Sequence, residues 1–264
     1  NIASAIEKAD MIVSLPKMKT HQLLYYTGGM KNLFGLVPGL QKSAFHLRFS
    51  ERALFARMIV DLNIAVKPSF TIMDAVTAME GPGPGNGKPR HAGLILASSN
   101  TLALDITAAR IMGYNPLDLP VISEALDRKI WLENAEDFET AGENIADAAL
   151  PGFEKIKILS DMAMFRDRMP SFIYKLVKKA AVPRPVFDHA KCIECGYCVR
   201  ICPAGALHLP PAGRDSRVHI DYSRCINCYC CHEICPAKAI SVKRMFFTRQ
   251  SGLLAPGAFP GWFN

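Results

Sequence analysis

The last third of the chain contains Cys192-Ile-Glu-Cys195-Gly-Tyr-Cys198-Val-Arg-Ile-Cys202-Pro203, and this stretch decides how that region folds. The same spacing returns in Cys225-Ile-Asn-Cys228-Tyr-Cys230-Cys231-His-Glu-Ile-Cys235-Pro236. Both runs follow the pattern C-x2-C-x2-C-x3-C-P, which is typical of bacterial proteins with two iron-sulfur clusters. Because the whole pattern occurs twice within one short region, a chance match is improbable.

The spacing also predicts which cysteines bind which cluster. The first three cysteines of each run lie in a tight loop and reach three irons of one cubane, whereas the fourth points to the other cubane. We therefore predict two [4Fe-4S] clusters with four ligands each. The first is held by Cys192, Cys195, Cys198 and Cys235, and the second by Cys202, Cys225, Cys228 and Cys231.

Two other uses of cysteine fit the spacing less well. Structural zinc sites place two cysteine pairs farther apart. Disulfides require an oxidising compartment, for which the chain shows no secretion signal. The ninth cysteine, Cys230, falls outside the ligand pattern, and we expect a reduced thiol beside the second cluster that can replace a ligand after oxidation. Two such clusters make a low-potential relay for single electrons.

Composition and charge narrow the class of protein. The 264 residues are 50% hydrophobic and 21% charged, a globular balance that excludes disordered and collagen-like chains. No apolar run is long enough for a transmembrane helix, since Ala53–Val66 is interrupted by Arg57 and Asp61. The chain begins without Met, and we expect an α/β domain that is incomplete at its N-terminus. We place the protein in the cytoplasm.

The region before the cysteines alternates short apolar strands with amphipathic helices, which predicts a mixed α/β domain over residues 1–162. Strands are expected at Met11–Leu15, Phe70–Val76 and Gly93–Ala97. Helices are expected at Ser50–Val66, starting at a Ser50-Glu51 cap, and at Asn100–Met112, capped by Asn100 and ended by Gly113. Residues 81–90 combine Gly and Pro and predict a loop.

Several motifs of this region resemble one known family. They are Leu15-Pro-Lys-Met-Lys-Thr-His21, Gly28-Gly-Met-Lys-Asn-Leu-Phe-Gly35, Asp74 with Met79-Glu-Gly-Pro-Gly-Pro84, Leu104-Asp105 and Ile111-Met-Gly113. On these motifs the chain is similar to the iron-sulfur proteins of the domain of unknown function 362 (DUF362). The resemblance implies a C-terminal ferredoxin module, an anaerobic or redox setting and a further strand and helix upstream. It implies no established reaction and no catalytic residues.

Polar side chains gather between the apolar elements of the front domain. Lys17, Lys19, His21, Lys31 and Asn32 fall in a predicted loop and helix start, where α/β folds place ligand sites. Asp74 and Glu80 lead into the Gly/Pro loop. We take His21, Lys31, Asn32 and Asp74 as the candidates for binding an anionic substrate and moving a proton. In the alternative interpretation the lysines are solvated, His21 and Asn32 satisfy loop backbone, and Asp105 is a buried structural group.

Four segments follow from these patterns. The α/β domain (1–162) is followed by a basic helix and linker (163–187), with Ser171–Ala181 as the helix, then by a small α+β ferredoxin-like domain (188–240) and an apolar, basic tail (241–264). We expect the tail to pack on the protein, with peripheral membrane contact as the alternative. Nucleic-acid binding by the basic helix is the less favoured interpretation.

Three functions remain open from the sequence. The leading hypothesis is an iron-sulfur redox protein in which the two clusters relay single electrons between an external donor or acceptor, such as a redox partner protein, and a site or partner on the α/β domain. It leaves open whether the protein is an oxidoreductase with a small-molecule substrate. The second is a non-enzymatic ferredoxin-like carrier or docking subunit of a larger oxidoreductase. The third is a regulatory protein that senses oxygen or redox state.

Overall fold

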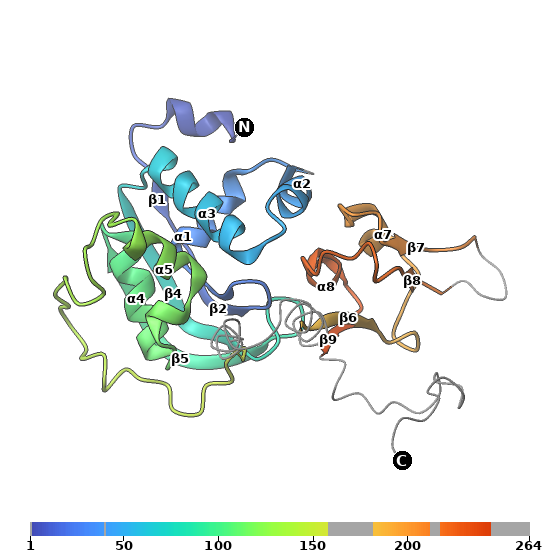
Figure 1. Cartoon of the computed structure of the whole chain (residues 1–264). Helices are drawn as coiled ribbons and strands as arrows, with labels where there is room; N and C mark the ends of the chain where they lie inside the picture. The colour runs from blue at the N-terminus through green and yellow to red at the C-terminus, as the bar shows by residue number, and fades with distance from the viewer. Residues whose placement is uncertain (1, 40, 158–181, 212–216, 244–264) are drawn as a thin grey trace, which may run out of the picture.

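The computed structural model describes residues 2–39, 41–157, 182–211 and 217–243. A larger α/β part lies beside a smaller part that carries the cysteines, and helix α8 of the smaller part faces the larger one (Figure 1). Among the described residues, no helix has the length and apolar character needed to cross a membrane. The predicted helix Ser171–Ala181 and nearly all of the predicted tail lie outside the described residues.

A five-stranded mixed sheet forms the frame of the α/β part. The long strand β4 (Phe70–Glu80) is paired on one edge by β1 (Val13–Ser14) and then β2 (Lys17–His21), both parallel to it. On its other edge β4 pairs antiparallel with β5 (Lys88–Ser98), and β3 (Tyr25–Thr27) extends the sheet beyond β2. This arrangement brings the predicted polar segment around residues 17–32 next to the end of β4.

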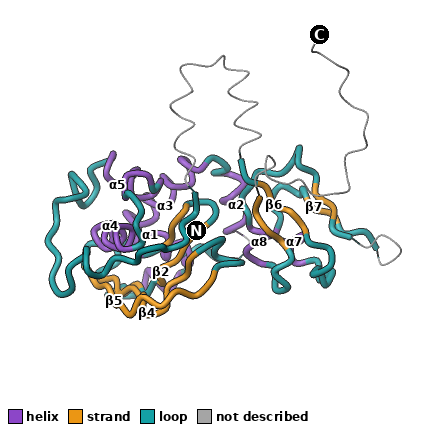
Figure 2. Tube along the Cα trace, turned by 90° about the horizontal axis from the view of Figure 1, so that it is seen from below, coloured by secondary structure: helices purple, strands orange, loops and turns teal. Residues whose placement is uncertain are grey.

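The helices cover one face of this sheet (Figure 2). They are α1 (Gly29–Asn32), α3 (Arg52–Val66), α4 (Thr101–Ile111) and α5 (Pro120–Asp127). Along β4, Met73 and Ala75 are fully buried against them, whereas Ile72 and Val76 are exposed on the opposite face. This period-two alternation is that of a sheet packed on one side. The shorter elements are the 3-10 turns Ser4–Lys8, Leu33–Leu36 and Pro116–Asp118, and α2 (Gln41–Arg48).

The two predicted helices of the α/β part are confirmed. The Asn100 side chain caps α4 by accepting hydrogen bonds from the amides of Leu102 and Ala103, and Gly113 follows the helix with a φ of 75°. The cap of α3 differs from the prediction, because Glu51 occupies the N-cap position and no side chain caps the helix there.

The strands of the structure differ in their boundaries from the predicted strands. Lys17–His21 was expected as a loop but is strand β2, because its alternating Met18 and Thr20 side chains are buried. Both β4 and β5 are longer than predicted, so the Gly/Pro loop shrinks from 81–90 to 81–87. Pro89 fits within β5 because β5 lies at the edge of the sheet, where a missing N–H need not interrupt a ladder.

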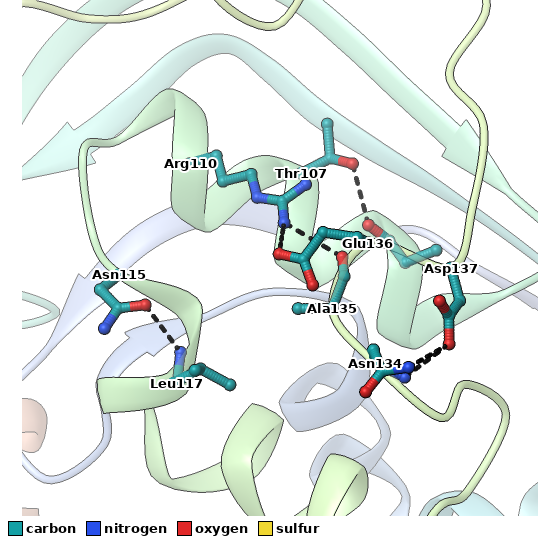
Figure 3. Close-up of polar contacts among 9 residues, drawn as sticks. Thr107, Arg110, Asn115, Leu117, Asn134, Ala135, Glu136 and Asp137 are labelled. Carbon is teal, nitrogen blue, oxygen red and sulfur yellow. Dashed lines mark hydrogen bonds and ion pairs between the residues drawn. The ribbon is translucent and has the colours of Figure 1, made fainter.

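Residues 128–157 run without helix or strand, yet side chains of α4 fix part of this segment (Figure 3). Arg110 donates to the backbone oxygen of Ala135 at 3.1 Å and to the Glu136 carboxylate at 3.0 Å. Asp137 accepts from the backbone and side-chain amides of Asn134 at 2.7 and 3.0 Å. These contacts hold part of the irregular segment against α4.

The cysteine-rich part is built from two short helices and two strand pairs. Helices α7 (Tyr197–Ile201) and α8 (Cys230–Ile234) each follow a cysteine loop. Strand β6 (Arg184–Phe187) pairs with β9 (Ile240–Lys243), and β7 (Leu207–His208) pairs with β8 (His219–Ile220), both antiparallel. The β6–β9 pair lies at the predicted boundaries 188 and 240, since β6 ends at Phe187 and β9 starts at Ile240.

Candidate functional site

The ligands predicted for the first cluster surround one small cavity. Its lining contains Cys192, Cys195, Cys198 and Cys235. Most of its other lining side chains are apolar, among them Phe187, Val218 and Ile240. Four thiols on an apolar enclosure are the donor set that a [4Fe-4S] cluster requires, so the residues present fit the group.

The ligands predicted for the second cluster also lie together. The thiol of Cys225 interacts electrostatically with Cys228 and Cys202. Cys231 interacts with all three and also with Cys198 of the first set. The fourth cysteine of each run accepts a hydrogen bond at its sulfur from a backbone amide: Ala206 N–H to Cys202 and Ala239 N–H to Cys235, both at 3.3 Å. Hydrogen bonds to ligand sulfur raise the potential of such clusters. Within the described part of the chain, no three His, Cys, Asp or Glu side chains are arranged around a single metal ion.

Cys230 lies at the start of α8, buried, and hydrogen-bonds to Cys228. It also lines a pocket on the side that faces the α/β part. This position is consistent with the predicted thiol beside the second ligand set.

Helix α8 is fitted closely into the Gly/Pro loop. The two ring nitrogens of His232 lie 2.7 Å from the Ile240 oxygen and 3.2 Å from the Pro82 oxygen. The Asn86 amide donates to the same Ile240 oxygen at 2.8 Å. A Cβ on Gly85 would lie 2.5 Å from the His232 carbonyl oxygen, so glycine is required for this approach. These contacts join the two parts of the molecule.

His21 connects the sheet to the same helix. The ring is buried, and its Nδ1 accepts hydrogen bonds from the amides of Leu23 and Leu24, so the proton of the neutral ring is on Nε2. That Nε2 lies 3.1 Å from the Glu233 carboxylate. Burial, assisted by the charge of Lys31, lowers the pKa of His21 to about 4. Burial acts to raise the pKa of Glu233, but its interactions with the His21 ring and with the Lys31 ammonium outweigh burial and lower the pKa to about 2.

A pocket of about 450 Å³ lies between the two parts. Ile201, Cys230, Glu233 and Ile234 form its wall on the cysteine-rich side. The α/β side contributes four lysines, Lys17, Lys19, Lys31 and Lys42, together with Asn32, Phe34, Ser43 and His46. The pKa of Lys31 is lowered chiefly by burial.

The structure brings three of the four candidate residues to this place. Lys31 and Asn32 line the pocket, with the Asn32 amide donating to Ser14 Oγ at 3.0 Å, and His21 lies behind Glu233. Asp74 lies outside the pocket lining, in an exposed ion pair with Lys17 at 2.6 Å. The hydrogen bond from Lys17 lowers the pKa of Asp74.

Asp105 is the buried structural group of the alternative interpretation. Its carboxylate accepts hydrogen bonds from the amides of Gly29 and Met30 at 2.6 and 2.9 Å and from the Tyr26 hydroxyl at 2.9 Å. A side chain on Gly28 would collide with Tyr26 and Asp105. The Gly28-Gly29 motif therefore allows Asp105 to fix the start of α1, which carries Lys31.

Several pocket residues were missed from the sequence. Lys42, Ser43 and His46 share a face of α2, a helix that was not predicted. Their i, i+1, i+4 spacing was the available signal. Glu233 lies inside the second cysteine run, where a surface role is the ordinary expectation, and the sequence gives no sign that it meets His21.

Each of the two parts of the chain matches the model of a known protein family. Residues 1–110 match the family model "Domain of unknown function (DUF362)", and residues 191–239 match the "4Fe-4S dicluster domain". The chain joins a DUF362 domain to a 4Fe-4S dicluster domain. Both the predicted family and the predicted ferredoxin module are thereby confirmed. The dicluster domain supports 4Fe-4S clusters and an electron-transfer role.

A curated relative matches part of the chain. The "Thylakoid-associated protein sll1697" of Synechocystis sp. is 40% identical over 116 residues. The alignment covers 44% of this chain and 36% of the relative, so the chain spans little more than a third of that protein's length.

Proposed function

We propose that this protein is an oxidoreductase that exchanges electrons between an external redox protein and a small molecule bound between the DUF362 and dicluster domains. The observation that carries the proposal is the pocket shared by the two domains. Its dicluster wall includes Ile201 and Cys230, which are the chain neighbours of the predicted ligands Cys202 and Cys231. When bound, the two clusters supply one-electron transfer.

The opposite end of the dicluster domain suits the redox partner. In the loop of the first ligand set, Ile193 and Tyr197 are 64% and 48% exposed. Apolar side chains exposed beside ligand cysteines offer a contact surface for another protein. We assign this exposed surface to the redox partner and the pocket wall at Ile201 and Cys230 to the small molecule.

Residues of the DUF362 domain are assigned to the bound molecule. Lys31 and Asn32 line the pocket and are placed to contact it, and the Lys31 ammonium is the group that we assign to proton transfer. His21 contacts Glu233 instead, so we assign it as a positioning residue for that wall. Asp74 has no part in this proposal because it lies outside the pocket lining.

The pocket supports the enzyme hypothesis over the carrier hypothesis. A carrier needs a docking surface, whereas a concave site with a few convergent polar groups is typical of small-molecule binding. The cytoplasmic location and the anaerobic setting stay predictions.

The test is anaerobic purification with iron and sulfide analysis and EPR, followed by a screen for compounds that oxidise the reduced protein in turnover. We expect about eight irons per chain, as two cubanes require. The double substitution His21→Ala with Lys31→Ala should abolish the turnover while the EPR signal of the clusters persists. Lys8→Ala, on the exposed turn Ser4–Lys8, is the control.

Two results would overturn the proposal. Iron well below eight per chain under strict anaerobiosis would exclude two cubanes. Turnover that is unchanged in the His21 and Lys31 double variant would remove these residues from the reaction.

A further inference from the structure

The pocket between the domains carries unbalanced positive charge. Four lysines line it, while Glu233 is its one lining carboxylate within the described residues. Lys17 is paired with Asp74. In the described ranges, no carboxylate lies within ion-pair distance of Lys19, Lys31 or Lys42. Three ammonium groups around one concavity favour an anion there.

A buried ring in the same wall has a nitrogen without a hydrogen-bond partner among the described residues. His46 is 6% exposed and stacks on Phe55 with the ring centres 4.5 Å apart. Its Nδ1 is buried and has no hydrogen-bond partner among the described residues. Burial lowers the pKa of His46 to about 4, so the ring is neutral at pH 7 and one of its nitrogens donates. A buried polar atom without a partner is unusual and indicates a missing ligand or water.

The remaining wall is apolar. Phe34, which is buried against Phe55 and His46, lines the pocket on the DUF362 side, and Ile201 and Ile234 come from α7 and α8. A volume of about 450 Å³ lies in the lower part of the range for sites of small organic ligands. The lining thus combines a cationic region with a hydrophobic one, and a simple inorganic ion would leave the hydrophobic part without a contact.

We propose that this pocket binds a small organic anion. Its carboxylate or phosphate is held by Lys19, Lys31 and Lys42. Its apolar body lies against Phe34, Ile201 and Ile234. The inference rests on the proposed function, because it names the class of molecule that exchanges electrons there. The competing explanation is that the lysines offset the negative charge of the cysteine ligands and bind nothing.

The experiment uses the anaerobically purified holoprotein and three probes, benzoate, phenyl phosphate and benzamide. Binding is measured by titration calorimetry and by NMR of the probes. We expect benzoate or phenyl phosphate to bind and the neutral benzamide not to bind, and the difference between the two anions identifies the head group. Lys31→Gln and Lys42→Gln should each weaken binding about five- to tenfold, the effect of one lost charge-assisted hydrogen bond.

Matched variants separate binding from folding. Lys31→Arg keeps the charge and should retain most of the affinity, and Lys8→Gln removes an exposed charge elsewhere and should change nothing. In the reduced protein the paramagnetic clusters should broaden the signals of a probe bound in this pocket more than those of a probe bound elsewhere.

Each contrary result is decisive. The inference fails if benzamide binds as well as benzoate, if no anion binds, or if Lys31→Gln and Lys42→Gln leave the affinity unchanged. If Lys31→Gln and Lys42→Gln lower the reduction potential of the clusters while no anion binds to the unsubstituted protein, the lysines serve charge compensation instead. Turnover found in the screen without anion binding would leave the proposed function intact, whereas anion binding without electron transfer would refute the function and keep the site.

Discussion

Replacing Asp105 with Ala should release the segment that presents Lys31 to the pocket. The carboxylate is 2% exposed and accepts three hydrogen bonds, from the amides of Gly29 and Met30 and from the Tyr26 hydroxyl. Ala is the best helix former, so α4 itself should persist. The effect should therefore fall on residues 29–32 rather than on the helix that contains the substitution.

The magnitude follows from the lost acceptors. A buried donor left without a partner costs about 1–2 kcal/mol, so three cost about 3–6 kcal/mol. Part of this is offset, because burial raises the pKa of Asp105 to about 6, which indicates that the ionised carboxylate is itself costly to bury. A net loss of about 3 kcal/mol corresponds to an increase of roughly a hundredfold in the opening equilibrium of this segment.

Hydrogen exchange measured by mass spectrometry reports that equilibrium directly. Amides of residues 29–32 should exchange about a hundredfold faster in Asp105→Ala, while those of α3 keep their protection. Tyr26→Phe, which removes one donor together with its hydroxyl, should change exchange by about tenfold or less. Unchanged protection in Asp105→Ala would refute the assignment of Asp105 as the anchor of α1.

Three further predictions concern the interface, a buried ring and the ligand assignment. Gly85→Ala should destabilise the contact with His232 by about 1–3 kcal/mol, the usual cost of overpacking, and should lower the thermal unfolding midpoint. His46 takes up a proton below about pH 6.5 in the unfolded protein but only below about pH 4 in the folded protein. The free energy of unfolding should therefore fall as the pH is lowered from 6.5 to 4. His46 should account for about 2 kcal/mol of the loss at pH 5, so His46→Phe should lose about 2 kcal/mol less than the unsubstituted protein, whose buried His21 also has a pKa of about 4; urea unfolding at pH 7 and pH 5 measures the difference. Cys202→Ser should alter the same EPR signal as Cys225→Ser; a change confined to the signal of the other cluster would contradict the crossed assignment.

The main helices could be predicted from the sequence because their signals are local, and the cluster ligands, which stay a prediction, rest on a local signal as well. The spacing of cysteines within one loop determines which sulfurs lie together, and Asn100 caps α4 through hydrogen bonds to amides two and three residues ahead. The grouping of the four cysteines around the first cavity follows the predicted set, including Cys235, which comes from the other run.

The pocket could be predicted from the sequence only in part, because its residues are brought together by packing between distant segments. Lys31 and Asn32 belong to a recognisable motif, but Glu233 reaches His21 only through the packing of α8 on the sheet, which no spacing in the sequence encodes. Asp74 lies near the Gly/Pro loop in the sequence, which makes it a candidate there. In the structure it is on the exposed face of β4, since alternate residues of a strand point to opposite faces.

Helix α8 has five residues, which is too short to be stable in isolation. The same helix holds Cys231, precedes Cys235 and supplies Glu233 and Ile234 to the pocket. Insertion of the clusters should therefore order this wall of the pocket, and the anion binding proposed above should require iron and sulfide to be installed first. Loss of the clusters would then affect the proposed function twice, by interrupting electron transfer and by disordering one side of the pocket.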